Sequence, residues 1–266
     1  MIANRPKRLG RRTASRRAAP PTGAGEPGFV VATYNVHKCI GVDRRHDPAR
    51  IAAVLRELDA DIICLQEVMT QDGGPRPLDQ EAFLAEATGL RAVFAAQRSD
   101  HRGRMGNAIL TRFPVLAVRH IDLSVEGYER RGALDVDLDA GGRLLRVVAT
   151  HLGLRGKERQ VQTRRLLAAL AAEGGRVNGG SEATLMMGDL NEWRGRRGGI
   201  RALDRAFGRA PAPRTFPSWC PILPLDRIYV APPAELLQFD VHRSPLARLA
   251  SDHLPLRARL AWRAAI

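Results

Sequence analysis

The chain has 266 residues, of which 44% are hydrophobic and 26% are charged, as in soluble globular proteins. This length suits one large domain, and no apolar run reaches the roughly 20 residues of a membrane-spanning helix. The formal net charge of +14 favours polyanionic partners, and the composition excludes a fibrous or integral membrane protein.

Half of the positive charge lies in an amino-terminal arm. The first 21 residues contain seven Lys and Arg and no acidic residue. Arg11–Arg12 and Arg16–Arg17 suggest a twin-arginine export signal, but prolines and a Gly-rich stretch follow where an apolar segment is required. We therefore expect residues 1–27 to form a disordered arm and residues 28–263 to form the folded domain. The arm either attracts nucleic acid or anionic lipid, or it is solvated without a dedicated partner.

The three cysteines are widely spaced and include no CxxC pair, so they indicate neither a disulfide framework nor a structural zinc site. We expect a reducing compartment and a cytoplasmic protein.

The first half of the domain alternates predicted strands with predicted helices. A helix is expected over residues 48–58, because Asp47 can cap it, Pro48 suits its first position, and apolar residues follow at helical spacing. A second helix is expected to end at Gly89. Apolar, β-branched runs predict strands at residues 28–37, 60–68 and 91–97.

The second half reads as hairpins followed by a further βα unit. Gly141–Gly142 predicts a hairpin turn, and residues 157–173 predict a long amphipathic helix. Strands are expected at residues 106–111, 115–123, 132–139, 143–152, 184–193, 225–230, 235–242 and 253–260. This mixture of βα units and hairpins predicts an α/β protein of mixed sheets packed face to face, with helices outside.

Several predicted strands end in polar side chains, in VVATYNVH, CLQEV, RVVATHLG and TLMMGDLN. Ligands collect at such strand ends, and alternating positions such as Asp189 and Asn191 point the same way along an extended segment. Carboxylates gathered there require a compensating cation or hydrogen-bond donors. The candidate set is Asn35, Glu67, His151, Asp189, Asn191, Asp226, Asp252 and His253.

The chemistry of this set favours a hard divalent cation. Oxygen ligands without a cysteine cluster suit Mg²⁺ or Mn²⁺. The two histidines are not arranged as HExxH or HxH, so they suit an acid, a base or a phosphate donor better than a zinc cage. The residues therefore predict metal-assisted phosphoester hydrolysis.

From about Phe29 to Leu260 the chain resembles the endonuclease/exonuclease/phosphatase superfamily, whose members include deoxyribonucleases of the pancreatic type. The resemblance rests on an ordered set of motifs: TYNVH, LQEV, GNAIL, ATHLG, GDLNEW, LDRIYV and SDHLPL. It implies a four-layer α/β/β/α sandwich, like that of deoxyribonuclease I, with the site at one edge of the two sheets. With HLGLRGKERQ, the pattern is similar to a small bacterial branch described only as metal-dependent hydrolases.

The resemblance also implies roles for the metal ligands and the acid–base residues. Glu67 is the expected principal metal ligand, assisted by Asn35 and Asp252. His253 is the expected general base and Asp226 its orienting partner.

Four further residues receive roles in the same way. Asp189 and Asn191 are expected to orient the water, bind the phosphate or hold a second metal, and His151 to donate on the phosphate side. Asn107 either supports the phosphate or holds a strand edge, and Arg131 either binds an anionic substrate or is a solvated surface residue.

Two substrate classes and one noncatalytic alternative stay open. The Pro-punctuated loop RTFPSWCPILPL, directly before Asp226, can hold a lipid chain, stack on a base, or fold over the core. We expect a phosphodiesterase or nuclease acting on nucleic acid or phospholipid. The alternative is a noncatalytic protein that retains the fold and binds nucleic acid or an anionic membrane.

Overall fold

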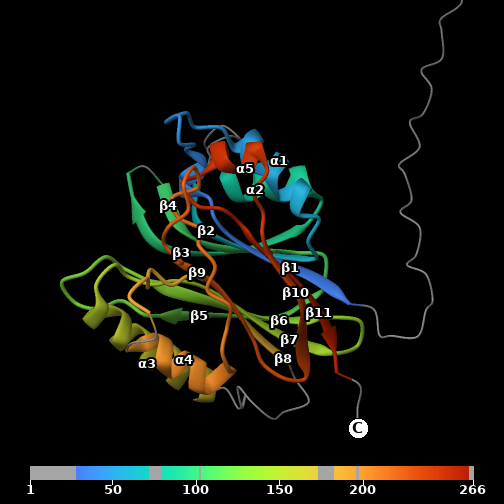
Figure 1. Ribbon diagram of the computed structural model, residues 1–266, viewed down its shortest axis with the longest axis vertical. Coiled ribbons are helices and arrows are strands. Elements are labelled where there is room, and N and C mark those ends of the chain that lie inside the picture. Colours follow the sequence, from blue (N-terminus) through green and yellow to red (C-terminus); the bar gives the residue numbers. More distant parts are fainter. Residues whose placement is uncertain (1–27, 72–78, 102, 173–182, 196–197, 264–266) are drawn as a thin grey trace, which may run out of the picture.

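The computed structural model describes residues 28–71, 79–101, 103–172, 183–195 and 198–263. Two mixed sheets pack face to face and carry helices on both outer faces (Figure 1). This helix–sheet–sheet–helix order confirms the predicted α/β/β/α sandwich. Across the described ranges, no helix combines the length and apolarity needed to span a bilayer. The predictions for residues 1–27 fall outside these ranges.

The first sheet has the strand order β10-β11-β1-β2-β4-β3. Its central strands β1 (Phe29–Asn35) and β2 (Ile62–Thr70) run parallel, because α1 (Pro48–Leu58) carries the chain back between them. The other strands are β3 (Arg91–Asp100), β4 (Gly103–Thr111), β10 (Ala234–Val241) and β11 (Leu256–Trp262).

The second sheet has the order β5-β6-β7-β8-β9. Here β7 and β8 are the parallel pair, and α3 (Gly156–Ala172) lies between them in the chain. The antiparallel β6–β7 hairpin turns at Gly141 and Gly142, both at positive φ, as the sequence predicts. The strand bounds are β5 (Val115–Asp122), β6 (Gly132–Asp139), β7 (Leu144–His151), β8 (Ala183–Asp189) and β9 (Asp226–Val230).

The helix ends follow local sequence signals. The carboxylate of Asp47 accepts the backbone N–H of Arg50 at 2.9 Å, which caps α1, and α2 (Gln80–Thr88) ends at Gly89 with φ 70°. Both predictions are confirmed. The sequence analysis missed the 3-10 turn η1 (His37–Cys39), α4 (Gly199–Phe207) and α5 (Pro245–Ala250).

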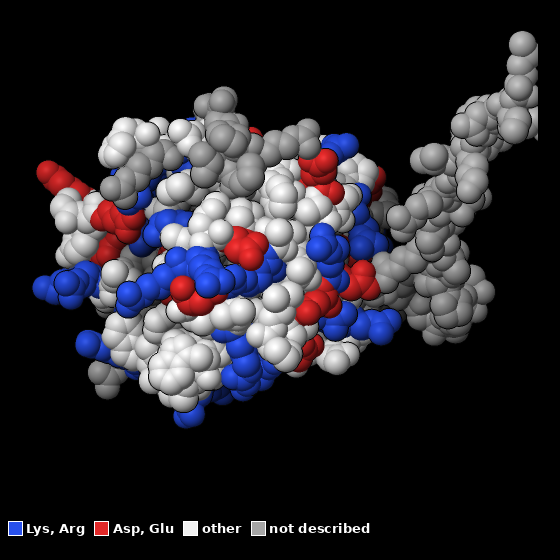
Figure 2. Space-filling view, turned by 90° about the horizontal axis from the view of Figure 1, so that it is seen from above, with Lys and Arg blue, Asp and Glu red and all other residues white. Residues whose placement is uncertain are grey.

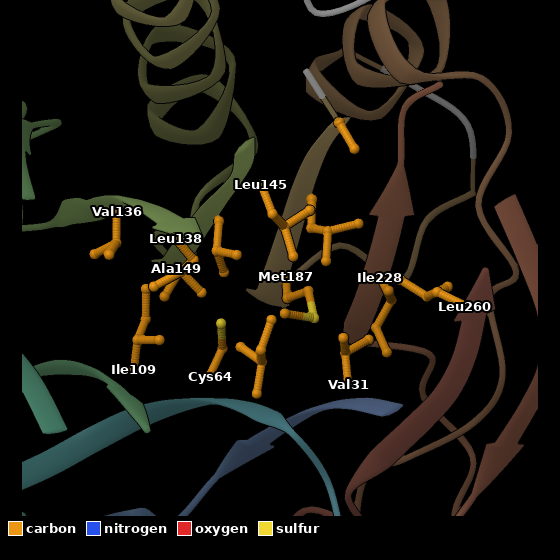
Figure 3. Packing of buried hydrophobic residues seen from close by; sticks show 14 of the residues in the cluster. Val31, Cys64, Ile109, Val136, Leu138, Leu145, Ala149, Met187, Ile228 and Leu260 are labelled. Carbon is orange, nitrogen blue, oxygen red and sulfur yellow. The ribbon is translucent and has the colours of Figure 1, made fainter. Parts of the chain in front are cut away.

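Three apolar layers hold the sandwich together. The central layer lies between the sheets and includes Val31, Cys64 and Met187 (Figure 3). A second layer joins the first sheet to α1, α2 and α5, and a third joins the second sheet to α3 and α4. The central strands of each sheet are therefore covered on both faces, which explains why strands such as β2 are nearly continuous apolar runs.

Charges of both signs are interleaved on the face above α1, α2 and α5 (Figure 2). Beside α1, for example, Arg50 pairs with Asp43 at 3.0 Å and with Asp47 at 3.3 Å. The positive net charge is therefore not gathered into one uniform patch on this face.

A buried ion pair crosslinks β6 and β7 under α3. Arg146 donates to both carboxylate oxygens of Asp135, at 2.6 and 2.9 Å, and also to the carbonyl of Leu170. The Asp135 side chain is fully buried. Burial raises the pKa of Asp135, but Arg146 and Arg119 outweigh it and hold that pKa below its ordinary value.

Asp135→Ala should lower the free energy of unfolding by about 3–5 kcal/mol in urea denaturation, because it leaves Arg146 buried without its carboxylate. The control is Asp137→Ala. Asp137 pairs with Arg119 in a partly exposed position, so its loss should cost about 1 kcal/mol or less. Equal losses in the two variants would contradict this account.

Candidate active site

The polar strand ends converge on one edge of the sandwich. Asn35 ends β1, His151 ends β7 and Asp189 ends β8, and the β7–β8 register places His151 opposite Asp189. A cleft of about 410 Å³ opens there. The predicted site residues that line it are Asn35, Glu67, Arg131, His151, Asp189, Asn191, Asp252 and His253.

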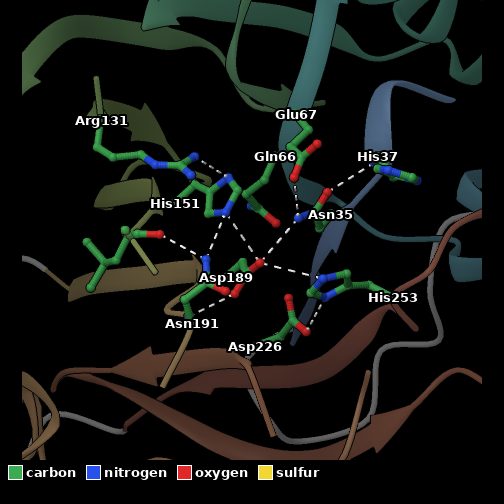
Figure 4. Close-up of polar contacts among 12 residues, drawn as sticks. Asn35, His37, Gln66, Glu67, Arg131, His151, Asp189, Asn191, Asp226 and His253 are labelled. Carbon is green, nitrogen blue, oxygen red and sulfur yellow. Dashed lines mark hydrogen bonds and ion pairs between the residues drawn. The ribbon is translucent and has the colours of Figure 1, made fainter. Parts of the chain in front are cut away.

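Asp189 lies at the centre of this group (Figure 4). Its Oδ2 accepts the Asn35 amide at 3.2 Å and lies 3.4 Å from His151 Nε2 and 3.6 Å from His253 Nε2. Its Oδ1 accepts the backbone N–H of Asn191 at 2.9 Å. A carboxylate only 1% exposed thus connects both histidines and both asparagines of the predicted set.

The end of β8 has an unusual backbone. Asn191 adopts φ 51°, and its amide donates to the Leu152 carbonyl at 2.9 Å while lying 3.1 Å from His151 Nε2. Gly188 adopts φ 153°, and a Cβ there would lie 1.8 Å from the Thr150 carbonyl oxygen. The glycine of GDLN therefore allows β8 to approach β7 closely enough to place Asp189 beside His151.

Glu67 projects from an irregularity in β2. The β2–β4 register shifts between Leu65 and Val68, and Glu67 adopts φ 57°. Such strained backbone clusters at functional sites, and here the bulge directs the carboxylate into the cleft. Glu67 Oε1 accepts the Asn35 amide at 3.2 Å, and Oε2 lies 3.4 Å from Lys38 Nζ.

These contacts keep Glu67 ionised. Burial raises the pKa of Glu67, but His151, which is protonated at the low pH where Glu67 titrates, together with Lys38 and the Asn35 amide, outweighs it and holds that pKa at about 2. The sequence analysis missed Lys38, which lies within the η1 turn at positive φ and lines the cleft.

His253 is held between two buried carboxylates. Its Nδ1 lies 2.9 Å from Asp226 Oδ2, which also accepts the Thr215 hydroxyl at 2.5 Å. The Phe216 ring packs against the imidazole at 5.0 Å. Burial lowers the pKa of His253, but Asp226 and Asp189 outweigh it and raise the pKa to about 10. Without further positive charge nearby, His253 is an imidazolium at neutral pH.

His151 is in the opposite protonation state. Burial, with a smaller effect of Arg131, lowers its pKa to about 4 against the pull of Asp189, so His151 is neutral at pH 7. Arg131 Nη1 lies 3.0 Å from His151 Nδ1 and its Nη2 donates to Glu129. A guanidinium can only donate, so Nδ1 accepts and the imidazole proton resides on Nε2, on the side of the Asp189 carboxylate. The Asn191 amide near Nε2 then donates to the Leu152 carbonyl and not to the imidazole. Arg131 is 6% exposed and is not a solvated surface residue.

Arg131→Met should therefore release His151 from a single tautomer. In wild-type protein, ¹⁵N–¹H correlation spectra should show His151 with Nε2 protonated and Nδ1 unprotonated. In the variant, the nitrogen chemical shifts of His151 should be averaged between the two tautomers. His253, whose Nδ1 faces Asp226, is the internal control and should keep its own pattern. An unchanged His151 spectrum in Arg131→Met would contradict this role.

Two groups of side chains offer ligand atoms to a cation. Asn35, Glu67 and Asp252 all line the cleft, and Asp252 is accessible, with its side chain 34% exposed. Asp189, Asp226 and His253 lie deeper, with one ligand atom from each within 4.8 Å of the others. Among the described residues, Asp226 Oδ1 has no hydrogen-bond partner. This oxygen-rich donor set suits Mg²⁺ or Mn²⁺.

Asn107 lies apart from this group and does not line the cleft. It is fully buried in β4, and its amide donates to the carbonyls of Gly132 and Ala149 in the other sheet, at 3.2 and 3.3 Å. A contact of Asn107 with substrate stays a prediction.

The comparisons with known proteins identify the family of this chain. The model of the endonuclease/exonuclease/phosphatase family matches residues 32–253, and the chain belongs to this family. It is 36% identical to the uncharacterized protein YbhP of Escherichia coli K12, over 87% of this chain and 96% of that protein.

Solved structures share the fold. The endonuclease/exonuclease/phosphatase from Beutenbergia cavernae superposes with a TM-score of 0.73 at 25% identity, covering 90% of this chain and 72% of that one. The mannosyl-6-phosphatase Bt3783 of Bacteroides thetaiotaomicron gives 0.69 at 19% identity, covering 88% and 100%.

Proposed function

We propose that this protein is a divalent-metal-dependent phosphoester hydrolase of the phosphodiesterase or nuclease type. The observation that carries the proposal is the placement of His253 between Asp226 and Asp189, at the floor of a cleft that also contains the ionised Glu67. Glu67, Asn35 and Asp252 would hold Mg²⁺ or Mn²⁺. Such a cation would supply positive charge that polarises the phosphoryl oxygens and lowers the pKa of His253.

His253 then acts as the general base. Asp226 accepts the N–H of Nδ1, which leaves Nε2 facing the cleft to take a proton from the attacking water. Asp226 also stabilises the imidazolium that forms. Asp189 and Asn191 orient the water and the phosphate, since both line the cleft beside His253.

His151 and Arg131 serve the phosphate side. Neutral His151 presents Nε2–H as a donor, and the neighbouring guanidinium supplies positive charge where negative charge develops on the phosphate. The two histidines thus have separate roles because their surroundings shift their pKa values in opposite directions.

The alternative is a noncatalytic protein that binds nucleic acid or an anionic membrane. A decayed enzyme usually loses a metal ligand or the base, whereas here Glu67, Asp226 and His253 are all present, which argues against it. We also propose a cytoplasmic location, in keeping with the three free cysteines.

The test is metal-dependent turnover of a parallel panel of phosphoesters. Plasmid DNA, single-stranded RNA, sphingomyelin, a glycerophospholipid, an inositol phosphate and the soluble diester bis(p-nitrophenyl) phosphate are each incubated with Mg²⁺ or Mn²⁺. We expect turnover of at least one, abolished by chelation and restored by added metal. The midpoint of thermal unfolding of the chelated protein should stay above the assay temperature, so that loss of turnover does not reflect unfolding. Binding without turnover across the panel would favour the noncatalytic alternative.

A further inference from the structure

The cleft is flanked by exposed apolar side chains that the chemistry above does not use. Leu154 and Trp193 line the cleft and are 61% and 40% exposed. Trp219 and Ile222, 68% and 57% exposed, lie in the loop whose residue Phe216 packs against His253. We call Leu154, Trp193, Trp219 and Ile222 the apolar rim. Keeping such side chains in water is unfavourable, so their grouping around a cleft indicates a binding surface.

The loop that carries Trp219 and Ile222 is built to hold them outward. Its two arms pair at Phe216 and Leu223, and both of these residues line the cleft. The Ser218 backbone N–H donates to the Asp252 carbonyl at 2.7 Å, and its hydroxyl donates to the Ser251 carbonyl at 2.7 Å. The base of the loop is therefore fixed to the segment that bears His253, while its tip projects into solvent.

The exposed charged side chains in the segments that carry the apolar rim have one sign. In residues 152–157, 190–195 and 213–225, all exposed charged side chains are basic: Arg155, Lys157, Arg194 and Arg214. The acidic side chains within or directly beside these segments are all buried: Glu158, Asp189, Glu192 and Asp226. This arrangement differs from the interleaved charges above α1, α2 and α5 (Figure 2).

We infer that the apolar rim docks the cleft onto an anionic phospholipid bilayer, so that the substrate is a phosphoester in a lipid headgroup. Tryptophan and arginine suit the headgroup level of a membrane, and aliphatic tips such as Ile222 and Leu154 insert below it. A nucleic acid would use Trp193 and Trp219 for stacking, but it contacts aliphatic side chains only at thymine methyl groups or as wedges between base steps, whereas a bilayer receives them along its whole surface. The combination of aliphatic tips, tryptophans and positive charge therefore favours lipid.

The inference rests on the proposed function for its substrate, whereas membrane docking is measured without catalysis. The full-length protein and two double variants are sedimented with phosphatidylcholine vesicles, with and without phosphatidylglycerol. Trp219→Ser with Ile222→Ser removes the two apolar side chains at the tip of the loop. Leu116→Ser with Leu237→Ser removes comparable side chains, 60% and 55% exposed, from β5 and β10, outside the residues that line the cleft. Both variants keep the basic arm.

We expect the wild-type protein and the control to bind the anionic vesicles, and the Trp219/Ile222 variant to partition about tenfold more weakly or worse. All three proteins should hydrolyse bis(p-nitrophenyl) phosphate equally, since no cleft-lining side chain is changed. Equal vesicle binding by the two variants would overturn the inference. It would also be overturned if the Trp219/Ile222 variant lost binding to single-stranded DNA but kept its binding to vesicles. Vesicle binding without diester hydrolysis by the wild-type protein would support the docking surface and overturn the proposed function.

Discussion

His253→Asn should lower kcat for a soluble phosphodiester by about a thousandfold or more, because it removes the group that takes the proton from water. Asparagine retains polarity at the site but cannot act as a base near neutral pH. The effect should appear in kcat with little change in KM, since His253 acts in the transition state more than in binding. Steady-state kinetics with saturating Mn²⁺ measure both quantities.

The matched control is His242→Asn. His242 pairs with Glu57 at 2.7 Å and does not line the cleft, so its loss should leave kcat unchanged. His253 is also the positive charge between two buried carboxylates, so thermal unfolding of each variant must be followed in parallel. A folded His253→Asn protein with wild-type kcat would refute the assignment of the base.

Glu67→Gln should have the second large effect, on metal affinity as well as on turnover. The substitution keeps the size of the side chain and removes the anionic oxygen, so we expect turnover at low Mn²⁺ to fall about a hundredfold or more. Excess Mn²⁺ should restore part of it. Calorimetric titration with Mn²⁺ should show correspondingly weaker binding.

Glu129→Gln serves as the control for Glu67→Gln. Glu129 lines the same cleft, but its carboxylate is 41% exposed and pairs with Arg131 at 2.8 Å. Its loss should leave Mn²⁺ affinity unchanged. Equal weakening by the two variants would mean that Mn²⁺ responds to the total charge of the cleft, with no specific ligand at Glu67.

The sequence predicted those parts of the fold that local patterns encode. Asp47–Pro48 and Gly89 marked helix ends because capping is a contact between near neighbours. The helix α4 was missed although Ile200, Leu203 and Phe207 have helical spacing, because it begins at Gly198–Gly199 without a side-chain cap. The six residues of α5 are too few for periodicity, but Ser244–Pro245 repeats the signal that identified α1 and could have located it.

For the site, the sequence predicted some residues and missed others. The sequence predicted that Asn35, His151 and Asp189 meet, because each follows an apolar run at the end of a predicted strand, where ligands collect. The positions of Lys38 and Arg131 depend on a turn at positive φ and on burial against His151, and neither leaves a periodic signal. The opposite protonation states of the two histidines follow from distances to carboxylates and a guanidinium, which only the three-dimensional structure provides.

A metal held at Glu67 would leave His253 free to act as a base. Anomalous diffraction from crystals soaked in Mn²⁺ tests this placement most directly, because it locates the ion independently of substrate. We predict a peak within coordinating distance of the Glu67 carboxylate, at the side of the cleft lined by Asn35 and Asp252. A sole peak among Asp189, Asp226 and His253, with the imidazole as a ligand, would contradict the account.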